Sequence, residues 1–188
     1  LMGNPEFRRG VPAAAPSLTE KATEERILSV RRWNGKLFSL RTTRSPAFRF
    51  EAGQFARLGI ASGRGGVIWR PYSMVSASYD EHLEFLSILV PEGAFSTRLA
   101  QAAVGDPLFV EKRPHGYLTT SRFAGGDDLW LLASGTGIAP FLSILRDPDT
   151  WQRHDNLVLA YSVREARDQA DRDEIAALPA DPLLADGK

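Results

Sequence analysis

The chain has 188 residues, of which 43% are hydrophobic and 24% are charged, and its formal net charge is zero. This length and composition predict a soluble globular protein of one large or two small domains, and they exclude a general electrostatic attraction to nucleic acid or membranes. The sequence contains no cysteine, which excludes disulfides, thiol catalysis and cysteine-ligated iron–sulfur clusters within it.

The first segment shows no periodicity. Residues 1–18 are rich in Gly, Pro and Ala, and residues 1–7 resemble a cloning remnant. We therefore expect a disordered leader that takes no part in the fold. No apolar run approaches the length of a membrane span, and no signal peptide is recognisable, so a cytoplasmic protein is expected.

Short apolar runs separated by turns follow between residues 24 and 111. Asn34-Gly35 lies between the runs 26–31 and 36–41, which predicts a β-hairpin. Further strands are expected at 54–60, 67–76, 83–90 and 107–111. Six short strands at this spacing predict a small antiparallel barrel of the Greek-key kind.

The fourth of these runs contains Arg70-Pro71-Tyr72-Ser73. In an extended chain Arg70 and Tyr72 share one face. The guanidinium of Arg70 suits a phosphate, and Tyr72 can stack on an aromatic ring system. The alternative for this segment taken alone is an ordinary strand with an arginine and a tyrosine at its edge.

One short helix interrupts the strands, and it is expected at residues 96–103 with Ser96 as its N-cap. The preceding turn, Gly93-Ala94-Phe95, would place the N-terminus of the helix where it could contact a phosphate. A capped surface helix in a barrel crossover is the alternative.

The pattern changes near residues 121–127, where we place a domain boundary. An apolar strand is expected at 129–133, a turn at 134–137, a helix at 138–146, a second strand at 156–161 and a second helix at 171–178. This alternation predicts a βαβ unit with parallel strands.

The turn Gly135-Thr136-Gly137 lies between a buried strand and a helix, where glycines let the backbone approach a pyrophosphate. Pro140 occupies the position of the third glycine of the dinucleotide fingerprint, which argues against an ordinary Rossmann dehydrogenase. Arg164 follows the second strand, where an arginine suits the 2′-phosphate of NADPH. The neighbouring Glu165 is the argument for NADH instead.

Four motifs in this order resemble those of the bacterial-type ferredoxin/flavodoxin–NADP(+) reductase family. They are Phe50–Phe55, Arg70–Ser73, Gly93–Thr97 and Gly135–Pro140, and together they span nearly all of the chain after the leader. The resemblance implies a β plus α/β fold, in which an FAD-binding barrel precedes an α/β domain that binds NADP(H). It also implies hydride transfer from NADPH to FAD and single-electron exchange with ferredoxin or flavodoxin.

The same resemblance assigns site residues. Those implied for FAD are Arg70, Pro71, Tyr72, Ser73, Leu86, Ser87, Ile88, Leu89, Gly93, Ala94, Phe95, Ser96, Thr97 and Thr136. Those implied for NADP(H) are Gly135, Thr136, Gly137, Arg164 and Arg172. Catalytic positions are implied for Ser73 beside the flavin N5, Tyr72 against the ring and Thr136 near the nicotinamide. Tyr161 stands where the family has a histidine, so the geometry around Arg164 is expected to differ.

We expect a leader at 1–18, the FAD-binding barrel at 19–123 and the NADP(H)-binding domain at 124–188. The family has more strands in its second domain than the two predicted here, and a parallel sheet of two strands would leave faces and edges uncovered. We therefore expect the second domain to be truncated at its C-terminus.

Three alternatives remain open: a reductase component of an oxygenase system, a free-flavin reductase, or a flavin-binding fragment without turnover. The histidines His82, His115 and His154 lack the spacing of metal ligands, so no metal site is predicted. A monomer that binds neither nucleic acid nor membrane is expected. Arg31, Arg32, Arg64 and Arg70 form either a basic rim for an acidic electron carrier or an ordinary solvated face.

Overall fold

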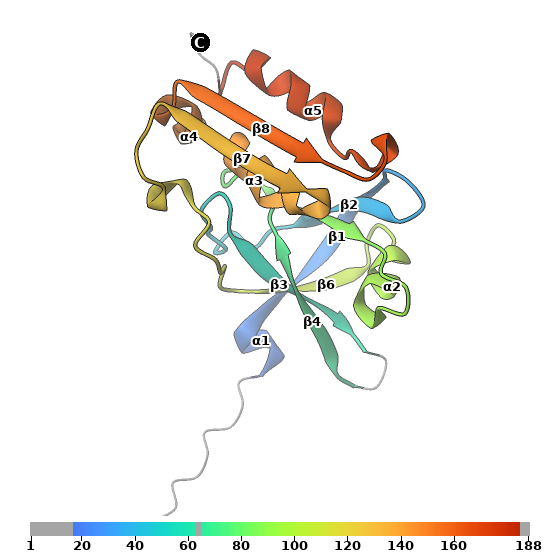
Figure 1. Cartoon of the computed structure of the whole chain (residues 1–188). Coiled ribbons are helices and arrows are strands. Elements are labelled where there is room, and N and C mark those ends of the chain that lie inside the picture. The colour runs from blue at the N-terminus through green and yellow to red at the C-terminus, as the bar shows by residue number, and fades with distance from the viewer. Residues whose placement is uncertain (1–16, 63–64, 185–188) are drawn as a thin grey trace, which may run out of the picture.

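A curled sheet of six antiparallel strands forms the first part of the molecule (Figure 1). The computed structural model describes residues 17–62 and 65–184. The strands are β1 (Ala22–Arg32), β2 (Leu37–Thr43), β3 (Phe55–Ala61), β4 (Val67–Ser73), β5 (His82–Ile88) and β6 (Pro107–Glu111). Their order is β4-β3-β6-β1-β2-β5, and the outer strands β4 and β5 meet at an isolated bridge between Met74 and Phe85. The predicted antiparallel architecture is confirmed, including the hairpin that pairs Arg32 with Phe38.

The interior of this sheet is a single hydrophobic cluster. Its largest fully buried side chains include Ile27, Phe38, Leu40, Leu58, Met74, Leu83, Phe85, Leu99 and Leu108. Burial of one such side chain stabilises the fold by about 1.5–3 kcal/mol. The strands that carry the candidate site residues, β4 and β5, are therefore held on a rigid support.

The helix after β5 differs from the prediction. It is α2 (Ala94–Ala100), which begins two residues before the predicted start, with Gly93 as the N-cap. Ser96 is therefore not the N-cap. Its hydroxyl instead accepts a hydrogen bond from the Val90 backbone N–H at 3.1 Å and also contacts the Val90 carbonyl at 3.3 Å. The serine closes the turn that leads into the helix.

The second part of the chain is a βαβ unit with two parallel strands, as predicted. It contains β7 (Asp128–Ser134), α3 (Ala139–Leu145), α4 (Pro148–Arg153), β8 (Asn156–Ser162) and α5 (Arg172–Ala177). Single turns of 3-10 helix also occur: η1 (Thr120–Arg122), η2 (Gly135–Ile138), η3 (Ala166–Asp168) and η4 (Leu178–Ala180). The sequence prediction missed α4, although Asp147 caps it and Pro148 opens it.

Helix α3 joins the two parts. Leu142 packs with Leu37 and Leu86 of the barrel, while Ile144 and Leu145 pack under β7. The Ser143 hydroxyl donates to the Ser76 carbonyl at 2.8 Å. The barrel and the βαβ unit thus share buried apolar contacts and a buried hydrogen bond.

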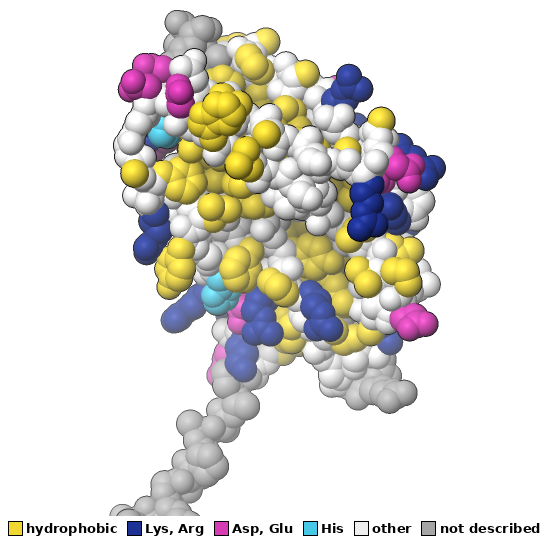
Figure 2. Space-filling model, in the orientation of Figure 1, with side chains coloured by type: hydrophobic (Ala, Val, Ile, Leu, Met, Phe, Trp, Pro, Cys, Tyr) yellow, Lys and Arg dark blue, Asp and Glu magenta, His cyan; other side chains and the backbone are white. Residues whose placement is uncertain are grey.

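The other face of the β7–β8 sheet carries exposed apolar side chains, which Figure 2 shows gathered over β7. Trp130 is 62% exposed and Leu132 is 69% exposed. The expectation of a poorly covered two-stranded sheet is therefore confirmed for the described residues.

Most of the predicted leader, residues 1–16, lies outside the described residues. The prediction was wrong for Ser17 and Leu18, because Ser17 caps α1 (Leu18–Lys21). Within the described part of the chain, no helix has the length and apolar character needed to cross a membrane.

Candidate functional site

A cleft lies between the C-terminal half of β4 and the end of β5, and we name it the β4–β5 cleft. Its volume is about 650 Å³. The predicted residues in its walls are Arg70, Pro71, Tyr72, Ser73, Leu86, Ser87, Ile88, Gly93, Ala94, Phe95, Ser96, Thr136 and Gly137. Leu89 and Thr97 do not line it. Most residues that the sequence assigned to one ligand therefore surround one space.

Tyr72 forms a fixed wall of this cleft. Its hydroxyl lies 2.9 Å from the Ser87 hydroxyl, and its ring packs against Phe85 and Phe95 with centroid distances of 6.5 and 5.6 Å. Burial raises the pKa of Tyr72, and the Ser87 hydrogen bond and the Arg70 charge offset this only in part. Tyr72 therefore remains a neutral phenol at physiological pH, suited to packing rather than to acting as a base.

Arg70 provides the positive charge of the cleft. Its Nη1 donates to the Trp69 carbonyl at 2.8 Å, and among the described residues it forms no ion pair with a carboxylate. The guanidinium therefore keeps most of its donors for an anionic ligand.

The turn between Val90 and Ser96 closes one end of the cleft. A Cβ on Gly93 would lie 2.7 Å from the Ser96 Oγ and 3.0 Å from the Val90 carbonyl oxygen, so only glycine fits without a shift. Glu92 has a left-handed φ of 63°. The turn is therefore built with little freedom beside Arg70 and Tyr72, which is suitable for holding a flat ligand with an anionic part.

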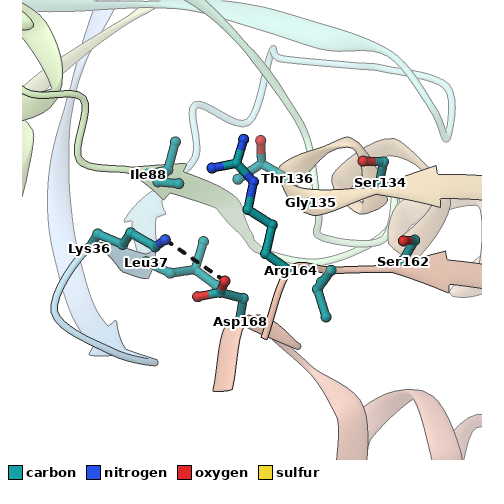
Figure 3. A pocket seen from close by; sticks show the side chains of 10 residues that line it. Lys36, Leu37, Ile88, Ser134, Gly135, Thr136, Ser162, Arg164 and Asp168 are labelled. Carbon is teal, nitrogen blue, oxygen red and sulfur yellow. Dashed lines mark ion pairs between the residues drawn. The ribbon is translucent and has the colours of Figure 1, made fainter. Parts of the chain in front are cut away.

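A second space, the β7–β8 cleft, lies outside the carboxyl ends of β7 and β8 (Figure 3). Its volume is about 440 Å³. Its walls contain the predicted residues Gly135, Thr136 and Arg164, together with Ile88. Arg172 is exposed at the start of α5 and lines neither cleft. Ligands of open α/β sheets bind at the carboxyl ends of strands, which is where this cleft lies.

The two clefts share residues. Ile88 and Thr136 line both of them. Gly135 has a left-handed φ of 53°, and a Cβ there would meet no atom of the described residues within 4 Å. The space beside this backbone is therefore open to a ligand. Molecules bound in the two clefts would approach each other at Ile88 and Thr136.

The sequence prediction missed several residues that line the clefts. They are Val90, Ala139 and Pro140 in the β4–β5 cleft, and Lys36, Leu37, Ser134, Ser162, Val163 and Asp168 in the β7–β8 cleft. Ser134, Ser162 and Val163 could have been found, because the first two end β7 and β8 and the third follows β8, at the carboxyl ends of parallel strands. Lys36 and Leu37 come from the β1–β2 hairpin, and no local pattern in the sequence indicates their position in the cleft.

A network of charges connects the barrel to the second part of the chain. Arg146 lies 3.5 Å from Glu84 and 3.2 Å from Glu174, and it donates to the Val75 carbonyl at 2.9 Å. Arg31 also pairs with Glu174, and its guanidinium lies 3.8 Å from the centroid of the Trp33 ring. Arg31 is therefore engaged within the molecule, which argues against its place in the basic rim.

The other arginines of the predicted basic rim also do not gather at one place in the described residues. Arg32 donates to the Ala100 carbonyl at 2.6 Å, and Arg64 lies outside the described residues. Only Arg70 of the four arginines lines a cleft within the described part of the chain. The described residues therefore do not bring these arginines together as one docking surface.

Asp171 is buried beside the charge network. It is only 1% exposed, and neither carboxylate oxygen has a hydrogen-bond partner among residues 17–62 and 65–184. Burial raises its pKa to about 7, with a further contribution from the neighbouring Glu174 carboxylate. Its backbone has a left-handed φ of 55°. Burial therefore disfavours the ionised form of Asp171, and its backbone has a conformation that is uncommon for a residue other than glycine.

Comparisons with known proteins show which proteins this chain resembles in sequence. Residues 131–182 match the family described as the oxidoreductase NAD-binding domain. The ferredoxin–NADP reductase A of Sorangium cellulosum is 47% identical over 148 residues, which are 79% of this chain and 53% of that protein. The ferredoxin–NADP reductase of Pseudomonas aeruginosa is 46% identical over 140 residues, which are 74% of this chain and 54% of that protein.

A solved structure shows the same likeness in three dimensions. The ferredoxin NADP+ reductase of Neisseria gonorrhoeae, with bound FAD and NADP, superposes with a TM-score of 0.80 at 43% identity. The match covers 84% of this chain and 63% of that one. The present chain spans about half the length of the curated relatives it matches.

Proposed function

Because this chain is a member of the ferredoxin–NADP reductase family, we propose that it is the FAD-binding and NADPH-binding part of a reductase that delivers single electrons to ferredoxin or flavodoxin. The observation that carries this proposal is the meeting of the two clefts at Ile88 and Thr136. Hydride transfer requires two bound molecules in contact, and adjoining clefts provide that contact.

The side chains that line the β4–β5 cleft suit the phosphates and the ring system of FAD. Arg70 would hold the pyrophosphate together with the turn at Gly93, Tyr72 would support the ring, and Ser73 would lie near the reacting nitrogen. When bound, FAD supplies the conversion between two-electron and one-electron chemistry. We propose that residues 19–123 form this FAD-binding domain and that residues 124–188 belong to the NADP(H)-binding domain. The protein residues position the reactants, and no acid–base pair is required for a hydride.

Arg70→Ala should weaken FAD binding about 10- to 100-fold, because one charge-assisted bidentate contact to the pyrophosphate would be lost. The measurement is a titration of the FAD-free protein with FAD, followed by the change in flavin fluorescence. Arg57→Ala on the neighbouring strand β3 is the control, since Arg57 is exposed and lies outside the cleft. Equal FAD affinities for the two variants would remove Arg70 from the site.

The β7–β8 cleft fits the phosphates of NADPH better than the bare ribose of NADH. Glu165, the argument for NADH, pairs with Arg167 at 2.7 Å and does not line the cleft. Asp168 does line it, but Asn34 donates to its carboxylate at 3.0 Å, so it is already engaged. Arg164 enters the cleft from the end of β8 toward Thr136 (Figure 3).

Arg164→Ala should raise the KM for NADPH about tenfold and change the KM for NADH much less, because the lost cation serves the 2′-phosphate. Steady-state reduction of ferricyanide with each nucleotide measures this. Arg172→Ala provides the comparison: the family resemblance assigns Arg172 to NADP(H), whereas it lies outside both clefts. If Arg164→Ala affects both nucleotides equally, the 2′-phosphate assignment fails.

The proposed function is tested by anaerobic titration of the FAD-loaded protein with NADPH and, separately, NADH. Bleaching of the flavin bands at lower NADPH than NADH concentration is the expected result. A protein that takes up no FAD would overturn the proposal. FAD binding without bleaching by either nucleotide would favour a flavin-binding fragment, and assays with ferredoxin, flavodoxin and free flavin would distinguish the reductase alternatives. The monomeric state and the cytoplasmic location remain predictions.

A further inference from the structure

The β7–β8 cleft contains a lysine that comes from the barrel. Lys36 is the last residue of the β1–β2 turn and lines the cleft together with Leu37, opposite Arg164 (Figure 3). Two cations from different parts of the fold therefore border one space of about 440 Å³. The family resemblance assigns no role to Lys36.

The backbone of this turn is tied firmly to the wall of the cleft. The Asn34 Oδ1 accepts hydrogen bonds from the backbone N–H groups of Lys36 and Leu37 at 3.0 and 2.9 Å. The Asn34 Nδ2 donates to the Arg167 carbonyl and to the Asp168 Oδ1, both at 3.0 Å. One asparagine thus fixes the start of the Lys36 side chain relative to η3.

The ammonium group, in contrast, is held weakly. Its contact is with the Asp168 Oδ2 at 3.8 Å, and the Lys36 side chain is 46% exposed. An ion pair of this length and exposure contributes little to stability. Asp168 also keeps its hydrogen bond from Asn34 if Lys36 moves. The ammonium can therefore turn toward an anion in the cleft at low cost.

We propose that Lys36 is a second phosphate-binding cation for the pyridine dinucleotide, supplied by the barrel to the β7–β8 cleft and held by Asp168 until the nucleotide arrives. This inference rests on the proposed function of that cleft. A lysine is a compact charge on a flexible stem, which complements the planar fork of Arg164. The chemistry common to the 2′-phosphate and the pyrophosphate is a phosphate anion, and binding measurements can separate the two.

The test is isothermal titration calorimetry of the full chain with NADP+, NAD+ and 2′,5′-ADP. Lys36→Gln should weaken NADP+ binding about tenfold, as expected for one charge-assisted contact. A contact to the 2′-phosphate predicts a matching loss for 2′,5′-ADP and none for NAD+. A contact to the pyrophosphate predicts equal losses for NADP+ and NAD+. Lys36→Arg should retain most of the affinity.

Two further variants make the interpretation specific. Asp168→Asn should tighten NADP+ binding about two- to fivefold by freeing Lys36, and less so when Lys36→Gln is also present. Lys112→Gln is the matched control, because Lys112 donates to the Thr19 carbonyl outside the cleft and should leave binding unchanged. If the wild-type protein and the Lys36→Gln variant bind NADP+ equally well, the inference about Lys36 is wrong and the proposed function is unaffected. If wild type binds none of the three probes, the proposed function fails with it.

Discussion

Gly53→Ala should destabilise the protein by about 3–5 kcal/mol, through backbone strain and a steric clash together. Gly53 has a φ of +95°, and an added Cβ would lie 1.9 Å from the Leu118 carbonyl oxygen and 3.0 Å from the Ile144 Cδ1. Leu118 belongs to the connection between β6 and β7, and Ile144 belongs to α3. The glycine therefore lies where the barrel, this connection and the second part of the chain meet.

Urea unfolding of the variant against wild type measures this loss, and Gly105→Ala is the matched control. Gly105 has a φ of +93°, nearly the same as Gly53, but an added Cβ there would meet no atom of the described residues within 4 Å. The control should lose only about 1–2 kcal/mol, the cost of the left-handed backbone alone. Equal losses for the two variants would show that the close approach of Leu118 does not matter.

Asp171→Asn should stabilise the protein at pH 8, by an amount that shrinks as the pH falls. The folded-state pKa of Asp171 is raised by burial from 3.8 to about 7. Between these values the folded state keeps a proton that the unfolded state loses, so the free energy of unfolding falls as the pH rises through this window. At 1.36 kcal/mol per pKa unit, the full effect above pH 7 is at most about 4 kcal/mol.

Asparagine removes the buried charge and also tolerates the left-handed φ of 55° at this position. The measurement is the free energy of unfolding of both proteins at several pH values from 4 to 8. The gain should be smallest near pH 4 and level off above pH 7. Glu174→Gln is the informative companion, because it removes the carboxylate that faces Asp171 and should lower the pKa of Asp171. A gain that does not vary with pH would mean that only the backbone strain was relieved.

The elements that the sequence predicted well are those in which local pattern and tertiary contact agree. The β1–β2 hairpin follows from Asn34-Gly35, and the order of strand and helix after residue 128 follows from the apolar runs. The start of α2 was wrong because Ser96 has two possible hydrogen-bonding roles, capping a helix or closing a turn, and only the structure shows the second. Local pattern alone cannot decide between such roles.

Some residues of the candidate site could likewise be placed from the local sequence, and others could not. Arg70 to Ser73 share a strand, so their common cleft follows from chain geometry. Lys36 reaches the β7–β8 cleft because the hairpin packs against η3, a contact between segments more than 130 residues apart in sequence. Arg172 was assigned to NADP(H) by the family resemblance, but it lies outside both clefts, because the left-handed turn at Asp171 decides where α5 begins. The residues next to Lys36 in the sequence therefore do not indicate that it lies in this cleft.

The residues that border both clefts, Ile88 and Thr136, have a thermodynamic consequence. A ligand that fixes these two side chains in one cleft also fixes part of the wall of the other. The two binding equilibria are then linked, and linkage is reciprocal: the factor by which FAD changes the affinity for the dinucleotide must equal the factor by which the dinucleotide changes the affinity for FAD. For the proposed reductase, the ratio of the dinucleotide affinities measured with and without FAD would therefore equal the ratio of the FAD affinities measured with and without the dinucleotide.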